Sequence, residues 1–314
     1  MILAYALGGG LGHVTRVRAL ASTLRWTEPL TILTSNPAAT DPRVCGTATT
    51  VLAPLAVARD RRGLEAFVRD TAARVAPDRV VIDTFPDGIL HELKQETFAA
   101  APLTHVTRAV KWAAYDARRP DRPDGRRPGD PDDGGAASGR ATRYAVTYAT
   151  EPLPSAQRTA LAARSLEVVD LDLRDVDEPA RDQDGRVVEG LRAALGAEDV
   201  RPLWIVVHSG PEPETLELVA YAREVARGSG ADPHLVVLTR ARPDGLDPEV
   251  VHLDLQPAWP LFGHADRVFA AAGSNVVRQL QPHRATTSLL PFERRYDDQH
   301  ARARRWRSEP PLRR

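Results

Sequence analysis

The chain has 314 residues, of which 42 are basic and 42 are acidic, so its formal net charge is zero. This length accommodates two domains with cores of their own, and the balanced charge excludes the global basic field that draws a protein to nucleic acid. The single cysteine, Cys45, excludes an internal disulfide and a cysteine-based metal cluster. Because the apolar start spans only Met1 to Leu7, too short for a signal peptide or a membrane span, we expect a cytoplasmic protein.

The first predicted strand leads into a glycine-rich turn. Ile2 to Leu7 is apolar, Gly8-Gly-Gly-Leu-Gly-His13 follows, and apolar residues then recur at helical spacing from Val14 to Leu24. A glycine turn at a helix N-terminus offers N–H groups to an anion, which makes Gly10 and Gly12 candidate phosphate contacts. His13 falls at the helix start, where an imidazole can serve as a base near neutral pH or simply bond locally.

Strand and helix patterns alternate through the rest of the first half. Continuous apolar runs such as Val80-Val81-Ile82 are typical of a parallel sheet covered on both faces. The predicted strands span residues 2–7, 30–34, 49–53, 79–83, 103–107 and 144–147, and the predicted helices span 14–24, 64–75 and 88–97. Ligands bind beyond the carboxyl ends of such strands, so Asp83, Asp87 and Arg108 are candidate substrate contacts. Either carboxylate is also a common helix cap.

Residues 116–141 consist largely of Arg, Pro, Asp and Gly and contain no side chain suited to a core. This composition predicts a mobile loop. Two interpretations stay open: a solvated insertion that the fold tolerates, or a lid that contacts a substrate.

A second series of strands and helices follows a change of composition. Residues 166–173 alternate like a strand, residues 175–184 are polar and linker-like, and we place the domain boundary between residues 164 and 165. The apolar strand 203–207 then runs into His208-Ser209-Gly210, followed by a helical pattern at 216–226 and strands at 235–238 and 250–255. The sequence therefore predicts an α/β protein with two similar domains.

The last strand-to-helix turn has the character of an anion site. Val268 to Ala272 is apolar and stops at Gly273-Ser274-Asn275, before a helical pattern. Free N–H groups and the positive end of the helix dipole converge at such a turn, and Ser274 and Asn275 can cap the helix or donate to a phosphate. Ser209 and Gly210 offer a second set of donors, so the two turns together can hold a diphosphate without a metal. The alternative is an ordinary strand-to-helix turn.

Taken in order, these motifs resemble those of a known family. Gly-Gly-Gly-x-Gly-His at the start, and Ala-Asp-x-Val, Ala-Gly-Ser, Pro-Phe and Asp-Gln near the end, resemble GT-B glycosyltransferases. Within these, they resemble the family 28-like branch, which contains the N-acetylglucosaminyltransferase that completes the peptidoglycan lipid precursor. The resemblance covers the first glycine loop and the part from residue 203 onward well, and the middle poorly.

The resemblance implies two Rossmann-like domains that face one another across a cleft, and inverting transfer from a nucleotide-diphospho-sugar. The donor it implies is a UDP-sugar, with no further cofactor and no catalytic metal. The chain has no Asp-x-Asp motif of the metal-dependent type, since Asp170-Leu-Asp172 falls on a predicted exposed strand face.

Site residues follow from the same resemblance. His13 would lie near the acceptor, as base or as a phosphate-side contact. The strand-end positions of Asp83 and Arg108 independently place them on the acceptor side, and Asp83 and Asp87 are the competing candidates for the base. Phe292, Asp298 and Gln299 would contact the donor sugar.

Two features depart from the family pattern. Gln279 stands where the family usually has a glutamate that binds the ribose hydroxyls, and it lacks the charge-assisted strength of a carboxylate. Family members also commonly continue with helices that return to the first domain, whereas here an arginine-rich segment follows Gln299. We therefore expect domain closure to depend on another element, such as a second subunit.

Two other functions remain alternatives. A sugar-nucleotide 2-epimerase uses the same fold but needs several acid/base groups around the sugar, and a degenerate nucleotide-sugar-binding partner protein needs no chemistry. The acceptor is left open among a small molecule, a lipid-linked sugar and a peptide. Peripheral membrane contact, a homodimer and an accessory subunit are also left open, and no nucleic-acid partner is expected.

Overall fold

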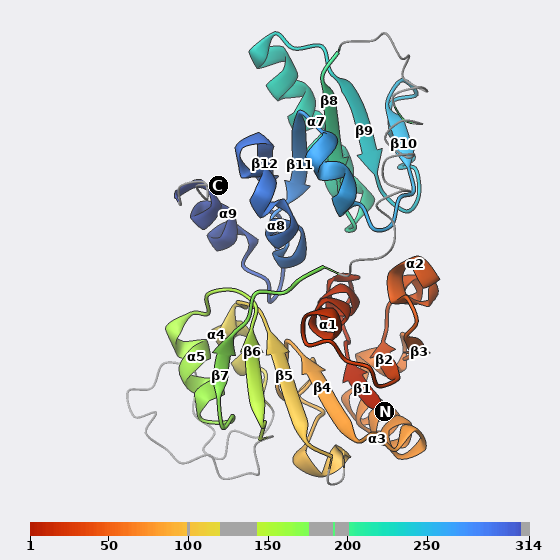
Figure 1. Cartoon of the computed structure of the whole chain (residues 1–314), viewed down its shortest axis with the longest axis vertical. Helices are drawn as coiled ribbons and strands as arrows, with labels where there is room; N and C mark the ends of the chain where they lie inside the picture. The colour runs from red at the N-terminus through yellow and green to blue at the C-terminus, as the bar shows by residue number, and fades with distance from the viewer. Residues whose placement is uncertain (99–100, 120–142, 176–190, 192–200, 309–314) are drawn as a thin grey trace. The chain divides into compact units, whose positions relative to one another are not determined.

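The computed structural model describes residues 1–98, 101–119, 143–175, 191 and 201–308. It consists of two α/β units, each built on one parallel sheet (Figure 1). The first unit comprises Met1–Asp175 and Arg295–Asp298, and the second comprises Val176–Arg294 and Gln299–Arg314. The predicted architecture of two Rossmann-like units is confirmed. Most of the predicted loop (120–141) and of the linker (176–184) lies outside the described residues.

The first sheet has seven parallel strands in the order β3-β2-β1-β4-β5-β6-β7. They are β1 Ile2–Tyr5, β2 Leu30–Thr34, β3 Thr49–Leu52, β4 Arg79–Asp83, β5 Leu103–Thr107, β6 Val146–Ala149 and β7 Val168–Asp170. The order changes direction between β1 and β4, and the loops after these two strands therefore leave the same point of the sheet edge. Such a switch point is where open α/β sheets bind ligands.

Helices cover both faces of this sheet. They are α1 Gly12–Thr23, α2 Pro42–Cys45, α3 Arg61–Val75, α4 Trp112–Asp116 and α5 Ser155–Ala162, with 3-10 turns η1 Pro37–Thr40, η2 Val57–Arg59 and η3 Gln95–Phe98. Because neighbouring residues of a strand point to opposite faces, Ile2 and Ala4 pack with α1 in one core, and Leu3 and Tyr5 pack with α3 in another. The N-terminus of α3 is capped by Asp60, whose carboxylate accepts from the Gly63 N–H at 2.7 Å.

Two predictions about the first unit were wrong. No helix spans residues 88–97, because Gly88 and His91 adopt positive φ angles of 82° and 57°, which interrupt a right-handed helix; only η3 forms, at the end of that range. The predicted boundary after residue 164 also falls too early. Strand β7 pairs with β6 in the first sheet, so the first unit continues to Asp175.

The second sheet has five parallel strands in the order β10-β9-β8-β11-β12. The strands are β8 Leu203–Val207, β9 His234–Leu238, β10 Val251–Leu253, β11 Arg267–Ala271 and β12 Thr287–Leu290. Among the described residues of this unit, the other elements are α7 Glu212–Ser229, η4 Trp259–His264, α8 Ser274–Leu280, η5 Gln281–Thr286 and α9 Gln299–Ser308. Here the switch point lies between β8 and β11, so the turns after these strands are neighbours.

The chain beyond β12 serves both units. Arg295–Asp298 belongs to the first unit, and α9 then returns to the second, where Ala303 and Trp306 pack into its core. In the part of the chain that the structure describes, no helix is both long enough and apolar enough to cross a membrane.

Candidate functional site

His13 and Asp83 meet at the switch point of the first sheet. His13 is the second residue of α1, which follows β1, and Asp83 is the last residue of β4. Because β1 and β4 are paired neighbours, the two side chains meet, with His13 Nδ1 2.5 Å from Asp83 Oδ2. Asp83 has no exposed surface and His13 keeps 9% of its own. The structure therefore builds a buried histidine–carboxylate pair.

Arg16 holds the other side of this carboxylate. Its Nε donates to Asp83 Oδ1 at 2.5 Å and its Nη2 donates to Asp83 Oδ2 at 3.0 Å and to Thr84 Oγ1 at 2.8 Å. Burial alone would raise the pKa of Asp83, but the Arg16 guanidinium and His13 hold that pKa well below its ordinary value. Asp83 is therefore an ionised carboxylate with both oxygens engaged. It lies behind His13, with no surface left for the acceptor contact proposed from the sequence.

These contacts define the state of the imidazole. An ionised carboxylate can only accept hydrogen bonds, so the proton of the neutral ring resides on Nδ1 and Nε2 keeps a free electron pair. Burial lowers the pKa of His13, and although Asp83 opposes this effect, Arg16 and Arg108 add to it. Both effects favour a neutral imidazole whose proton-accepting atom is Nε2.

The glycine that this site needs is Gly8. A Cβ atom on Gly8 would lie 2.2 Å from His13 Nε2, so only glycine lets the ring lie against this loop. In contrast, Gly10 is exposed with open space around its Cβ position, and Gly12 is the half-buried first residue of α1. The close contact in this loop is therefore between the His13 ring and Gly8, and the phosphate contacts of Gly10 and Gly12 stay predictions.

Thr84 carries backbone strain beside this pair. Its φ angle is 67°, in the left-handed region that a β-branched residue rarely adopts, at a cost of roughly 1–3 kcal/mol. The Thr84 N–H donates to the Val106 carbonyl at 2.7 Å and Arg16 bonds its hydroxyl, so the surrounding structure holds it there. Strain of this kind is typical of functional sites.

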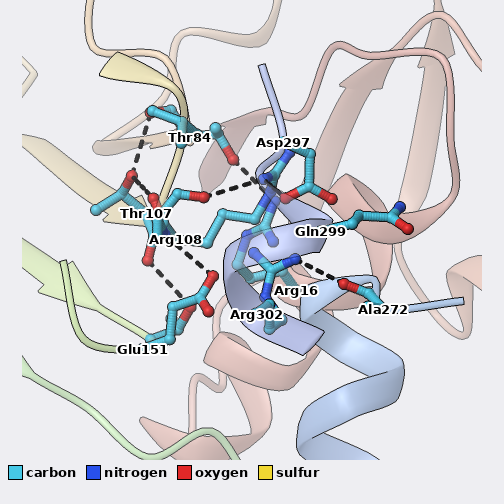
Figure 2. A network of polar contacts seen from close by, with 12 residues as sticks. Arg16, Thr84, Thr107, Arg108, Glu151, Ala272, Asp297, Gln299 and Arg302 are labelled. Atoms are coloured by element: carbon cyan, nitrogen blue, oxygen red, sulfur yellow. Dashed lines mark hydrogen bonds and ion pairs between the residues drawn. The ribbon is translucent and has the colours of Figure 1, made fainter. Parts of the chain in front are cut away.

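The other candidates of the first unit have partners of their own. Asp87 accepts two hydrogen bonds of 2.9 Å from Arg164, and both side chains are buried, which identifies a structural ion pair rather than a base. Arg108 donates to Asp297 at 2.5 Å (Figure 2), and the Lys111 N–H donates to the Tyr296 carbonyl at 2.7 Å. These bonds tie the segment Arg295–Asp298 into the first unit.

Three loops of the second unit gather at the carboxyl edge of its sheet. Val207 of β8 is in register with Ala270 of β11, and Ala271 is in register with Leu290 of β12. The turns 208–210, 272–275 and 291–294 therefore leave neighbouring strands at the same edge. Ser209 and Gly210 are exposed, and Gly273, Ser274 and Asn275 are half-buried. Gly273 is the N-cap of α8 and, as a glycine, contributes no capping side chain.

A second histidine–carboxylate pair joins the turn after β8 to the first turn of α7. His208 Nε2 is 2.9 Å from Glu214 Oε2, and Arg294 binds the same carboxylate through both of its terminal nitrogens. A Cβ atom on Gly210 would lie 2.4 Å from His208 Nε2, so the glycine makes room for this ring. The group joins the turn after β8 to the turn after β12.

Helix α9 packs against the same edge, where two of the predicted donor contacts make bonds or contacts within the protein. Gln299 is buried, and its Oε1 accepts from the Phe292 N–H at 3.0 Å. Phe292 is itself buried in the core beside the His208 ring. Arg302, 3% exposed, donates to the Ala272 carbonyl at 2.7 Å (Figure 2). Gln299 and Phe292 thus support the conformation of these loops. The other two predicted donor contacts, Asp298 and Gln279, are half-buried.

Sequence reasoning missed the arginine of the His13 site. Arg16 follows His13 by three residues on α1, a spacing that places two side chains on one helix face. That face also carries Val14, Val17 and Leu20, all buried. A charged residue inside an apolar helical stripe was the available signal, and the abundance of arginine in this chain obscured it.

Two Rossmann-like units with these strand orders form a GT-B fold, and comparison with known proteins agrees. No protein-family model and no curated protein matches the chain. Among solved structures, the glycotransferase of kitacinnamycin matches 97% of this chain and 83% of its own, at 13% identity and a TM-score of 0.57. A UGT transferase from Siraitia grosvenorii, in complex with UDP, matches 97% of this chain and 82% of its own, at 11% identity and a TM-score of 0.55.

The same fold likeness extends to a different enzyme class. The UDP-GlcNAc 2-epimerase of Methanocaldococcus jannaschii, in complex with UDP-GlcNAc and UDP, matches 98% of this chain and 99% of its own. Its identity to this chain is 9% and the TM-score is 0.50. At these identities the comparisons show the fold, and the chemistry has to be argued from the site.

Proposed function

We propose that this protein is a glycosyltransferase that moves a sugar from a nucleotide-diphospho-sugar to a hydroxyl-bearing acceptor, with inversion at the anomeric carbon. The observation that carries the proposal is the buried His13–Asp83 pair at the switch point of the first sheet. It supplies a neutral, oriented base at the place where this fold binds ligands.

The chemistry is a single displacement. His13 Nε2 accepts the proton of the acceptor hydroxyl as its oxygen attacks the anomeric carbon, and the bond from that carbon to the diphosphate oxygen breaks. The imidazolium that forms is stabilised by the ionised Asp83, which keeps the ring in one orientation throughout. The nucleoside diphosphate leaves with the electron pair, and the product is a glycoside of opposite configuration.

The second unit is proposed to bind the donor. Its turns at Ser209-Gly210 and Gly273-Ser274-Asn275 follow adjacent strands, which supports a diphosphate site at that edge of the sheet. UDP is the favoured nucleotide, because two of the solved structures with this fold contain it. Backbone N–H groups supply the stabilisation of the leaving group, and we expect no requirement for a divalent cation.

The test is a screen of UDP-sugars and other nucleoside-diphosphate sugars against hydroxyl-bearing acceptors, with nucleotide release as the readout. We expect His13→Ala to lower the turnover rate by about a hundredfold or more with little change in donor affinity, the range for a positioned base. EDTA should leave the wild-type rate unchanged. Full activity of His13→Ala, or activity that EDTA abolishes and magnesium restores, would contradict the mechanism.

A 2-epimerase is the second candidate, and the likeness to the Methanocaldococcus jannaschii enzyme is the observation that favours it. Incubation of UDP-GlcNAc without acceptor separates the two functions. An epimerase inverts the configuration of the sugar at C2, whether the sugar stays attached to the nucleotide or is released from it. A transferase leaves the C2 configuration intact. A partner protein without activity binds UDP in calorimetry and changes no sugar.

A further inference from the structure

Arg16 contacts both oxygens of Asp83, the carboxylate behind His13. The guanidinium donates from Nε to Oδ1 at 2.5 Å and from Nη2 to Oδ2 at 3.0 Å, and its side chain is 2% exposed. The same Nη2 bonds the hydroxyl of the strained Thr84, which in turn donates to Asp83 Oδ2 at 3.2 Å. All four groups are buried, so bulk water does not compete for these bonds.

We propose that Arg16 is a positioning residue for the proposed transfer reaction. By holding both carboxylate oxygens in a planar fork, it keeps Asp83 in one orientation as the acceptor of the His13 Nδ1–H, and thereby leaves Nε2 as the proton-accepting atom. This inference rests on the proposed function of His13, although the state of the ring can be measured without any substrate.

The position of Arg16 also affects the pH at which the His13 ring loses its proton. The charged groups that face the ring are Asp83 from β4, Arg16 from α1 and Arg108 from the end of β5. Asp83 favours the charged imidazolium, whereas Arg16 opposes it and compensates the Asp83 charge. Without Arg16, the negative charge of Asp83 acts on the ring uncompensated, so the imidazolium persists to higher pH.

The chain offers a matched control. Arg164 and Asp87 form a second buried bidentate pair in the first unit, with two bonds of 2.9 Å that involve neither His13 nor Asp83. Arg164→Gln breaks a comparable ion pair at a comparable cost in stability. A merely structural role for Arg16 would give Arg16→Gln and Arg164→Gln the same phenotype.

The experiment follows the His13 ring by NMR in the full chain, with its resonances assigned through His13→Gln. In the wild type we expect the Nδ1–H tautomer and titration below the ordinary histidine pKa. Arg16→Gln should move the titration to higher pH and mix the tautomers, whereas Arg164→Gln should do neither. With substrates, kcat/KM of Arg16→Gln at neutral pH should fall by about tenfold or more, the range for groups that orient a reacting ligand. The acid limb of the pH dependence of kcat/KM should also move to higher pH.

The outcomes separate the two proposals. A His13 titration and tautomer in Arg16→Gln that match those of Arg164→Gln would overturn the role of Arg16. Altered titration in Arg16→Gln, in a protein that transfers no sugar and epimerises none, would support the role of Arg16 and overturn the proposed function.

Arg16→Lys covers the case in which Arg16→Gln does not fold. Lysine keeps the charge but cannot hold two oxygens in a plane. We expect the titration of His13 to stay near that of the wild type while its tautomers mix and the rate falls. A lysine variant with wild-type tautomer and wild-type rate would show that the fork is dispensable, which overturns the inference.

Discussion

His105 lies in the middle of β5 and has no exposed surface. Its Nε2 is 3.2 Å from the Thr84 carbonyl and its Nδ1 is 3.3 Å from Thr147 Oγ1. Burial lowers the pKa of His105 to about 4. In the folded protein this ring therefore stays neutral under conditions in which the unfolded chain would protonate it.

The consequence is a loss of stability in acid. Between the ordinary histidine pKa of 6.5 and about 4, the unfolded state binds one proton more than the folded state, so the free energy of unfolding falls as the pH falls. The pKa difference between the unfolded and the folded state corresponds to a loss of roughly 3 kcal/mol in the free energy of unfolding. This loss is complete only below the folded-state pKa. Urea titrations from pH 7.5 to pH 4.5 should show a steeper decline in the wild type than in His105→Gln. Parallel declines would contradict the prediction.

Helix α8, which begins at Ser274 after the N-cap Gly273, is the proposed donor-binding helix. Ser274→Asp places a carboxylate beside the expected diphosphate, and we expect nucleotide binding to weaken by about 1–3 kcal/mol through repulsion and a lost charge-assisted bond. Calorimetry with UDP measures this difference. Ser274→Ala is the control, because it removes the hydroxyl without adding charge and should weaken binding less. Unchanged affinity in Ser274→Asp would remove this turn from the donor site.

Helix α9 holds the same turn from behind. Arg302 donates to the Ala272 carbonyl, one residue before Gly273, and Arg302→Ala leaves that carbonyl unpaired. We expect a loss of roughly 1–3 kcal/mol in the free energy of unfolding and weaker UDP binding, since the turn loses its support. Arg304→Ala, at an exposed position of the same helix, is the matched control and should change neither quantity. Equal effects of the two substitutions would show that Arg302 acts only through helix charge.

At the scale of the whole molecule, the two units have separate hydrophobic cores. The clusters around β1 and β4 share no residue with those around β8 and β11. We therefore expect two unfolding transitions in scanning calorimetry. UDP should raise the temperature of one, because a ligand stabilises the unit that binds it, and Arg164→Gln should lower that of the other. A single transition that both perturbations shift would show that the units unfold as one.

The sequence alone was sufficient to predict two parallel α/β units, the strand-turn-helix at each switch point and the place of His13, because apolar runs and glycine turns are local patterns. The prediction of a helix at 88–97 was wrong because the positive φ angles of this segment depend on buried contacts. One of them is the Glu92 carboxylate, which lies where a Gly88 Cβ would be.

The tertiary structure decided which side chains meet. Arg16 and Asp83 are 67 residues apart and pair only because β1 and β4 are neighbours. Likewise, Gln299 accepts a bond from the Phe292 N–H because α9 packs against the loop after β12. Burial and strand order are properties of the assembled fold, so no local pattern specifies them.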